Sequence, residues 1–283
     1  MIRALKLLGL HRRGTANARD LRHRALAGTL ARLPPAVEGY RILHLSDLHL
    51  DTLDSIEEAI VARIRGLKCD LVVMTGDYLT FHPWDATTIR AQFERILGAT
   101  KPSDGVLAVL GNHDDVKVAD LLQSLGVSVL ANETLDLARG EDRLRVVGID
   151  DPHRFYTPEA GALLARRHEG CSLVLAHTPE VADLAAGAGH DLYLCGHTHW
   201  GQVCLPGGTP IITALYANRR LAQGVWRQGA MLGYTHAGCG VSRIPVRFFT
   251  RGEVVMLTLG RGPAEIVETA APGLTCGSEA TGN

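Results

Sequence analysis

Residues 41–49 read Arg-Ile-Leu-His-Leu-Ser-Asp-Leu-His, a short β-favouring run that leads directly into Asp47 and His49. The run predicts a buried strand. Residues two apart at a strand end point the same way, so both side chains can reach one cavity. Carboxylates and imidazoles are typical ligands of borderline divalent metals. Because an isolated Asp-x-His is common by chance, the interpretation depends on whether the pattern recurs.

The pattern recurs four times, each time as a predicted strand followed by a polar cluster. Strands predicted at 70–75, 105–110, 171–176 and 191–195 precede Gly76-Asp77, Gly111-Asn112-His113-Asp114, His177 and Gly196-His197-Thr198-His199. Binding sites form at the carboxyl ends of such strands. Two cations about 3.5–4 Å apart need a shared oxygen ligand, and Asp77 is the natural bridge. The five clusters together predict a dinuclear metal site.

Helical periodicity between these strands predicts an α/β protein. Helices are expected at 55–67, opened by a capping box of Ser55 and Glu58, and at 85–97, 116–125, 158–168 and 179–186. A hairpin is predicted from 134–138 and 143–149, and further strands at 201–205, 210–213, 230–235 and 253–259. His44 faces away from its neighbours in a period-two strand, which favours a packed core histidine.

Composition excludes a membrane-spanning or disordered chain as a whole. The 283 residues are 46% hydrophobic, which suits a globular protein with a sizeable core. The six cysteines form no C-x-x-C pair and indicate reduced thiols, so a cytoplasmic protein is expected. The longest apolar run near the N-terminus is residues 7–10, too short for a signal peptide or a membrane span.

The N-terminal segment differs in charge from the rest of the chain. Residues 1–40 contain eight Lys or Arg against two acids, a charge of +6, and a total of −1 leaves −7 for the remainder. We expect a basic amphipathic leader at 1–39, a main domain at 40–260 and a disordered tail at 261–283. Residues 1–33 can form a helix on the anionic inner face of a membrane, or a solvated leader that packs on the domain.

The ordered clusters resemble the calcineurin-like metallophosphoesterase superfamily over about residues 40–260. The resemblance implies a four-layer α/β/β/α sandwich with two bound cations. One cation would be held by Asp47, His49, Asp77 and His199, and the other by Asp77, Asn112, His177 and His197. The resemblance also implies that His113 contacts the phosphate and the leaving group. Asp114 would lie behind His113 and hold its tautomer.

Residues 196–202, with Pro206 and residues 244–248, are similar to the bacterial YkuE/YaeI-type branch of that superfamily. This branch often has an N-terminal anchor and is associated with phosphodiesterase activity, sometimes on lipid-linked substrates. The chain differs from it at Trp200, where glycine is usual. It also has Thr-Arg-Gly-Glu at 250–253 in place of Pro-Pro-Glu.

The expected reaction is attack on phosphorus by hydroxide from a metal-activated water. The loop after Asp77 lacks the Asp-Arg-Gly of the protein phosphatases, which favours a diester or pyrophosphate of a nucleotide or a lipid over a phosphoprotein. Tyr78 and Trp200 are expected to line the substrate pocket. The mixed ligand set accepts Mn, Fe, Zn or Co, so the metal stays open.

Two other functions are compatible with the sequence. A non-catalytic scaffold of the same fold is one, although every expected ligand type is present. The other is accessory nucleic-acid binding through the basic leader. The chain has no base-stacking or groove-reading element, so nucleic acid is not expected as a partner.

Overall fold

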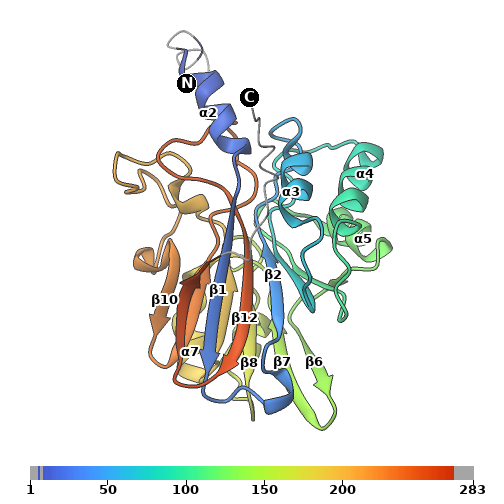
Figure 1. The fold of residues 1–283 in the computed structure, drawn as a ribbon, viewed down its shortest axis with the longest axis vertical. Helices are drawn as coiled ribbons and strands as arrows, with labels where there is room; N and C mark the ends of the chain where they lie inside the picture. The colour runs from blue at the N-terminus through green and yellow to red at the C-terminus, as the bar shows by residue number, and fades with distance from the viewer. Residues whose placement is uncertain (1–5, 7–8, 271–283) are drawn as a thin grey trace, which may run out of the picture.

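The computed structural model describes residue 6 and residues 9–270, which form two mixed β-sheets packed face to face (Figure 1). The first sheet has the strand order β13-β1-β12-β2-β3-β4-β5. Its strands are β1 (Arg22–Leu30), β2 (Arg41–Leu45), β3 (Leu71–Thr75), β4 (Val106–Val109), β5 (Ser128–Val129), β12 (Glu253–Arg261) and β13 (Glu265–Thr269). The second sheet has the order β10-β11-β9-β8-β7-β6. Its strands are β6 (Glu133–Arg139), β7 (Asp142–Gly148), β8 (Ser172–Leu175), β9 (Leu192–Cys195), β10 (Gly224–Gln228) and β11 (Met231–Thr235).

Helices cover the outer face of each sheet, which confirms the predicted α/β/β/α sandwich. The first sheet is covered by α3 (Ile56–Ile64), α4 (Ala86–Leu97) and α5 (Val116–Ser124), and the second by α6 (Pro158–Ala165) and α7 (Ala182–Ala188). The remaining helical elements are α2 (Leu10–Arg19), η1 (Pro35–Val37), η2 (Pro179–Val181), η3 (His199–Gly201) and η4 (Arg219–Leu221). Among the described residues, none of the helices has the length and apolar character needed to cross a bilayer.

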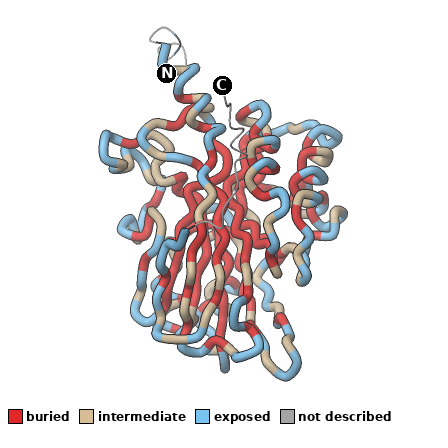
Figure 2. Tube along the Cα trace, in the orientation of Figure 1, coloured by how far each residue is buried: buried red, intermediate tan, exposed pale blue. Residues whose placement is uncertain are grey.

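The strands that precede the polar clusters are buried on both faces, as Figure 2 shows for the centre of the sandwich. In β3, Leu71 and Val73 pack between the sheets. Val72 and Met74 pack instead under the helices. Burial on both faces explains the continuous apolar runs in the sequence. Each of the five predicted strands is present within one residue of its predicted ends.

Strand direction brings the clusters together at one end of the sandwich. β2, β3 and β4 are parallel to one another, and β8 is parallel to β9. The carboxyl ends of parallel neighbours lie at the same edge of a sheet. The backbone N–H of His197 donates to Asp47 Oδ1 at 3.1 Å, which joins the loops of the two sheets, so the polar loops after these five strands converge.

The N-terminal segment differs from both interpretations of the leader, because residues 22–30 form strand β1 inside the first sheet. β1 is parallel to β12 on one side and antiparallel to β13 on the other. Leu26, Gly28 and Leu30 are buried and the residues between them are only partly so, which is the period of a strand. The helical prediction holds only for α2. The sheet thus includes residues on both sides of the predicted boundary at residue 39.

Three other predictions are wrong in detail. β12 and β13 place residues 261 and 265–269 of the expected tail in the first sheet, while residues 271–283 lie outside the described residues. Residues 201–205 and 210–213 form only the isolated bridges Val203–Phe248 and Cys204–Pro210, because prolines and positive-φ glycines interrupt this segment. Ser55 has a φ of 62° and makes no side-chain cap bond, so the capping box is absent.

His44 is the buried core histidine that its strand position predicts. Its Nε2 atom lies 2.9 Å from Thr75 Oγ1, and burial lowers its pKa to about 3. The fold therefore favours the neutral imidazole. This group contributes its full stability above the unfolded pKa of 6.5, and the contribution is lost as the pH falls towards 3.

We expect the free energy of unfolding of the metal-free protein to fall by about 1.5 kcal/mol more between pH 6.5 and pH 5 than that of His44→Gln. Urea titrations of the two proteins at both pH values measure this difference. The buried histidines that do not contact His44 are the same in both chains, so their contributions cancel; the exception is His236, whose ring centroid lies 4.8 Å from that of His44. Parallel pH dependence of the two proteins would show that His44 is not the group responsible.

Candidate metal centre

The backbone leaves the strands in conformations that L-residues rarely adopt. Five predicted ligands have positive φ: 50° at Asp47, 41° at His49, 57° at Asp77, 72° at His197 and 49° at His199. Each such residue costs on the order of 1–3 kcal/mol and persists only where the surrounding structure fixes it. Their concentration in the converging loops marks this end of the sandwich as a functional site.

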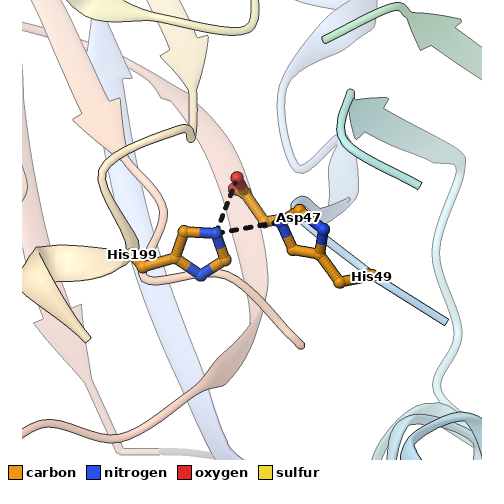
Figure 3. Close-up of side chains that lie close together, drawn as sticks. All are labelled: Asp47, His49 and His199. Carbon is orange, nitrogen blue, oxygen red and sulfur yellow. Dashed lines mark hydrogen bonds and ion pairs between the residues drawn. The ribbon is translucent and has the colours of Figure 1, made fainter. Parts of the chain in front are cut away.

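Asp47, His49 and His199 form the first cluster, and all three are buried (Figure 3). The Nε2 atoms of His49 and His199 are 3.1 Å apart. His199 Nε2 lies 3.4 Å from Asp47 Oδ1. The close-up shows the two imidazoles and the carboxylate pointing toward one another.

Asp77, His177 and His197 form the second cluster. His177 Nε2 lies 3.3 Å from Asp77 Oδ2 and 3.2 Å from His197 Nδ1. Asn112 Oδ1 is also 3.2 Å from His177 Nε2. The structure therefore brings together all four residues expected around this position.

Asp77 lies between the clusters through one carboxylate oxygen. Its Oδ2 atom is 3.3 Å from His177 Nε2 and 3.7 Å from His49 Nε2. The other oxygen, Oδ1, accepts a hydrogen bond of 2.9 Å from the backbone N–H of His113. The carboxylate is thus held with Oδ2 toward both clusters, the position that a bridging ligand requires.

The outer nitrogens of three imidazoles have hydrogen-bond partners, and a carbonyl partner assigns the tautomer. His49 Nδ1 lies 2.6 Å from Thr80 Oγ1, His177 Nδ1 lies 2.7 Å from the Thr75 carbonyl, and His197 Nε2 lies 3.3 Å from the Ala214 carbonyl. When both imidazoles are neutral, donation to the two carbonyls turns the lone pairs of His177 Nε2 and His197 Nδ1 toward the site, where these atoms are 3.2 Å apart. Such contacts fit ligands that share a cation.

Burial and neighbouring charges also shift the pKa values of the clustered side chains. Burial lowers the pKa of His49 to about 4 and that of His197 to about 3, so both imidazoles stay neutral, as metal ligation requires. Burial raises the pKa of Asp47 to about 7. Burial opposes the charged form of His177, but Asp77 outweighs it and raises the His177 pKa well above its ordinary value. In the metal-free protein this favours a proton on His177 Nε2 beside Asp77, and ligation of a cation would require the loss of that proton.

Glycines leave the space for this arrangement. A Cβ atom at Gly196 would collide with the Asp47 carboxylate, and one at Gly111 would collide with the Asp77 carboxylate. The donor set, the inward lone pairs and this clearance fit a pair of divalent cations. Mixed imidazole and carboxylate ligands are typical of Mn, Fe, Co and Zn sites.

The hydroxyl of Thr80 is expected to control the affinity of the first cluster for metal, because it orients the His49 imidazole. We expect Thr80→Val to weaken binding of the cation there by about 10–100-fold. Thr80→Ser keeps a hydroxyl and should restore most of the affinity. Metal titration followed by calorimetry compares the two variants. Equal affinities for the valine and serine variants would exclude this role.

His113 and Asp114 occupy different environments from those expected. His113 Nδ1 lies 3.2 Å from the Thr80 carbonyl, and the side chain lines the cavity above the clusters. The Asp114 carboxylate accepts hydrogen bonds from the backbone N–H groups of Gly111 and Asp77 at 2.8 Å and of Tyr78 at 2.9 Å. The expected Asp114–His113 hydrogen bond is therefore replaced. Asp114 joins the loops after β3 and β4, and the Thr80 carbonyl orients His113.

The clusters open into a cavity of about 710 Å³ lined by both polar and apolar side chains. The polar lining includes Asp77, Asn112, His113, His153, His197 and His199. We call the large apolar lining residues the apolar wall; they are Val203, Ile211, Ile212, Ile244, Val246 and Phe248. An amphipathic ligand matches such a lining.

Neither aromatic residue predicted for the pocket lines this cavity. Tyr78 is fully buried, and its hydroxyl donates to the carbonyls of Met74 at 3.1 Å and Val109 at 2.8 Å. Trp200 donates from Nε1 to the Thr235 carbonyl and lines a separate cavity of about 520 Å³ beside Arg24. Buried tyrosine hydroxyls and tryptophan indole N–H groups usually form hydrogen bonds, and these hydrogen bonds hold Tyr78 and Trp200 away from the metal cavity.

Two residues near the site were not anticipated. His153 lines the cavity, stacks on Tyr216 at 4.8 Å and lies 2.8 Å from Glu180 Oε2. It follows no strand, so strand-end position did not identify it. Arg247 is fully buried, and its guanidinium donates to the carbonyls of His199 at 3.2 Å and Gly240 at 2.9 Å. A lone arginine in an apolar stretch was the only sequence signal.

The fold and the paired clusters define a metal-dependent phosphoester hydrolase. The chain belongs to the calcineurin-like phosphoesterase family, whose model matches residues 40–201. It is 30% identical over 236 residues to the uncharacterized metallophosphoesterase YkuE of Bacillus subtilis (strain 168), covering 80% of this chain and 81% of that protein. It is 32% identical over 234 residues to phosphodiesterase YaeI of Escherichia coli (strain K12), covering 78% and 82%. The predicted family and branch resemblance are confirmed.

Proposed function

We propose that the protein is a dinuclear metal-dependent phosphodiesterase or pyrophosphatase whose substrate carries an apolar group, as nucleotide- and lipid-linked esters do. One observation supports this most strongly. Asp77 Oδ2 faces both ligand clusters, and the clusters open into a cavity whose lining also includes six large apolar side chains. A phosphate bound at the clusters would place its organic group against the apolar wall.

The first cation would be held by Asp47, His49, Asp77 and His199, and the second by Asp77, Asn112, His177 and His197. When bound, the cations neutralise the phosphoryl oxygens and make water a better nucleophile at neutral pH.

The residues of the chain orient the reactants. The apolar wall holds the organic group and excludes water from it. His113, oriented by Thr80, donates a hydrogen bond or a proton to the leaving oxygen. His153, held by Glu180, contributes a second imidazole to the polar lining of the cavity.

Two observations favour a diester or pyrophosphate over a phosphoprotein. The loop after Asp77 reads Tyr-Leu-Thr-Phe in place of Asp-Arg-Gly. The relative YaeI is named a phosphodiesterase.

The test is a substrate screen on protein reconstituted with Mn²⁺, Fe²⁺, Co²⁺ or Zn²⁺ in parallel. We expect two cations per chain and faster hydrolysis of bis(4-nitrophenyl) phosphate or a nucleoside diphosphate sugar than of 4-nitrophenyl phosphate. Diesters with longer alkyl groups should have a lower KM. A phosphoserine peptide as the best substrate would refute the diester proposal, and two bound metals without turnover would favour a scaffold.

A further inference from the structure

Large apolar side chains are exposed on the segments that contribute the apolar wall of the metal cavity. We call Leu205, Ile211, Ile212 and Phe249 the apolar rim, and their exposed fractions are 53%, 57%, 71% and 61%. Scattered exposed apolar residues are ordinary, but these come from two adjoining segments. The Val203–Phe248 bridge and the bond from Cys204 N–H to the Phe248 carbonyl join the segments.

The apolar rim continues into the site. Ile211 and Ile212 belong to both the rim and the apolar wall of the cavity. The path from the rim to the metal clusters is therefore lined in part by apolar side chains. An ester with a long hydrocarbon group can follow this path without exposing that group to water.

A basic helix packs beside the rim. Thr15 of α2 donates to the Pro245 carbonyl at 2.9 Å, and Asn17 donates to the Arg247 carbonyl at 3.0 Å. These bonds fix α2 to the segment that carries Phe249, and Figure 1 shows the helix at that end of the molecule. Arg12 and Arg13 are exposed, and neither pairs with a carboxylate within residues 9–270.

The segments of this face are rich in arginine, although Asp20 at the end of α2 pairs with Arg251. Residues 10–19, 201–218 and 236–252 contain no Asp or Glu. They contain six arginines, three in the first segment (12, 13 and 19) and three in the last (243, 247 and 251). All except Arg247 are exposed. The chain as a whole has a net charge of −1, so this face is positive against a slightly acidic background.

We propose that this face docks on an anionic lipid bilayer, with the apolar rim at the acyl boundary and Arg12 and Arg13 against the headgroups. Apolar side chains flanked by cations are what peripheral membrane binding requires. A protein seated on the rim would cover residues that also line the cavity, whereas a bilayer can supply an amphiphilic ester along them. Docking is a property separate from the proposed hydrolysis, because binding to vesicles can be measured without any turnover.

The test is sedimentation of the full-length, metal-loaded chain with vesicles of 30% phosphatidylglycerol in phosphatidylcholine, and with phosphatidylcholine alone. We expect binding to the anionic vesicles that weakens at high salt. Leu205→Ser/Phe249→Ser should reduce partitioning by about tenfold or more, since both residues leave water on docking. Arg12→Gln/Arg13→Gln should reduce it by about fivefold per arginine.

Val225→Ser on β10 is the matched control, because Val225 is 44% exposed and lies in the second sheet outside the rim. It should bind vesicles like the unaltered chain. Leu205 and Phe249 do not line the metal cavity, so turnover of a soluble diester reports on folding of their double variant. Failure of the proposed hydrolysis would leave the vesicle result intact.

Three outcomes would overturn docking. One is the absence of binding to anionic vesicles. Another is an equal loss of vesicle binding in the rim variant and in Val225→Ser. The last is concentration-dependent dimerisation that the rim variant abolishes without any vesicle binding, which would make the rim an interface between two copies of the chain.

Discussion

Asp77→Asn is expected to lose both cations and to lower phosphodiester hydrolysis by at least about three orders of magnitude while the fold is retained. The amide has the same shape as the carboxylate. Its oxygen can keep the hydrogen bond from the His113 N–H, which Oδ1 accepts at 2.9 Å. The NH₂ group would then replace Oδ2, the atom that faces both clusters, and present protons to the cations.

Elemental analysis and turnover of the purified variant measure both effects. Asp136→Asn is a suitable control, because Asp136 pairs with Arg145 on the β6–β7 hairpin and belongs to neither cluster. It should keep two cations and full turnover. Full metal occupancy in Asp77→Asn would show that Asp77 is not the bridging ligand.

His113→Ala is expected to lower turnover by about two to four orders of magnitude with both cations still bound. His113 lines the cavity and, unlike His49 or His177, belongs to neither ligand cluster. The loss should be smallest for nitrophenyl esters, whose leaving anion is stable, and largest for alkyl esters. His197→Ala and His199→Ala should instead lose metal.

A leaving-group series with metal analysis of each variant separates these roles. An equal penalty across the series would assign His113 to phosphate binding rather than to proton donation. Loss of a cation in His113→Ala would make it a ligand. Retained metal with a penalty that rises with leaving-group basicity supports acid catalysis.

The core strands were predictable because burial on both faces forces a continuous apolar run. β2 to β4, β8 and β9 all have such runs. β1 was missed because its first residues are arginine and histidine, and a glycine and a threonine interrupt its apolar positions. Its pairing with β12 connects residues more than 200 positions apart, which no local pattern encodes.

The ligand residues were predictable because metal chemistry restricts residue types and strand ends restrict their positions. Their supporting partners were not. Asp114 bonds three backbone N–H groups, and Thr80 supports both His49 and His113. Tyr78 was placed in the pocket because it follows Asp77, but two carbonyl acceptors hold it in the core. Such choices depend on contacts between distant loops rather than on neighbours in sequence.

The position of β1 also sets an order for folding on the ribosome. Both sheet neighbours of this strand, β12 and β13, lie between residues 253 and 269, near the end of the described chain. At about 5–20 residues per second, synthesis from residue 30 to residue 253 takes roughly 10–45 seconds. Throughout that interval β1 has neither of its native partners. The strand nearest the start of the chain is therefore among the last to be paired, and it presents unpaired backbone groups to chaperones or to other nascent chains until then.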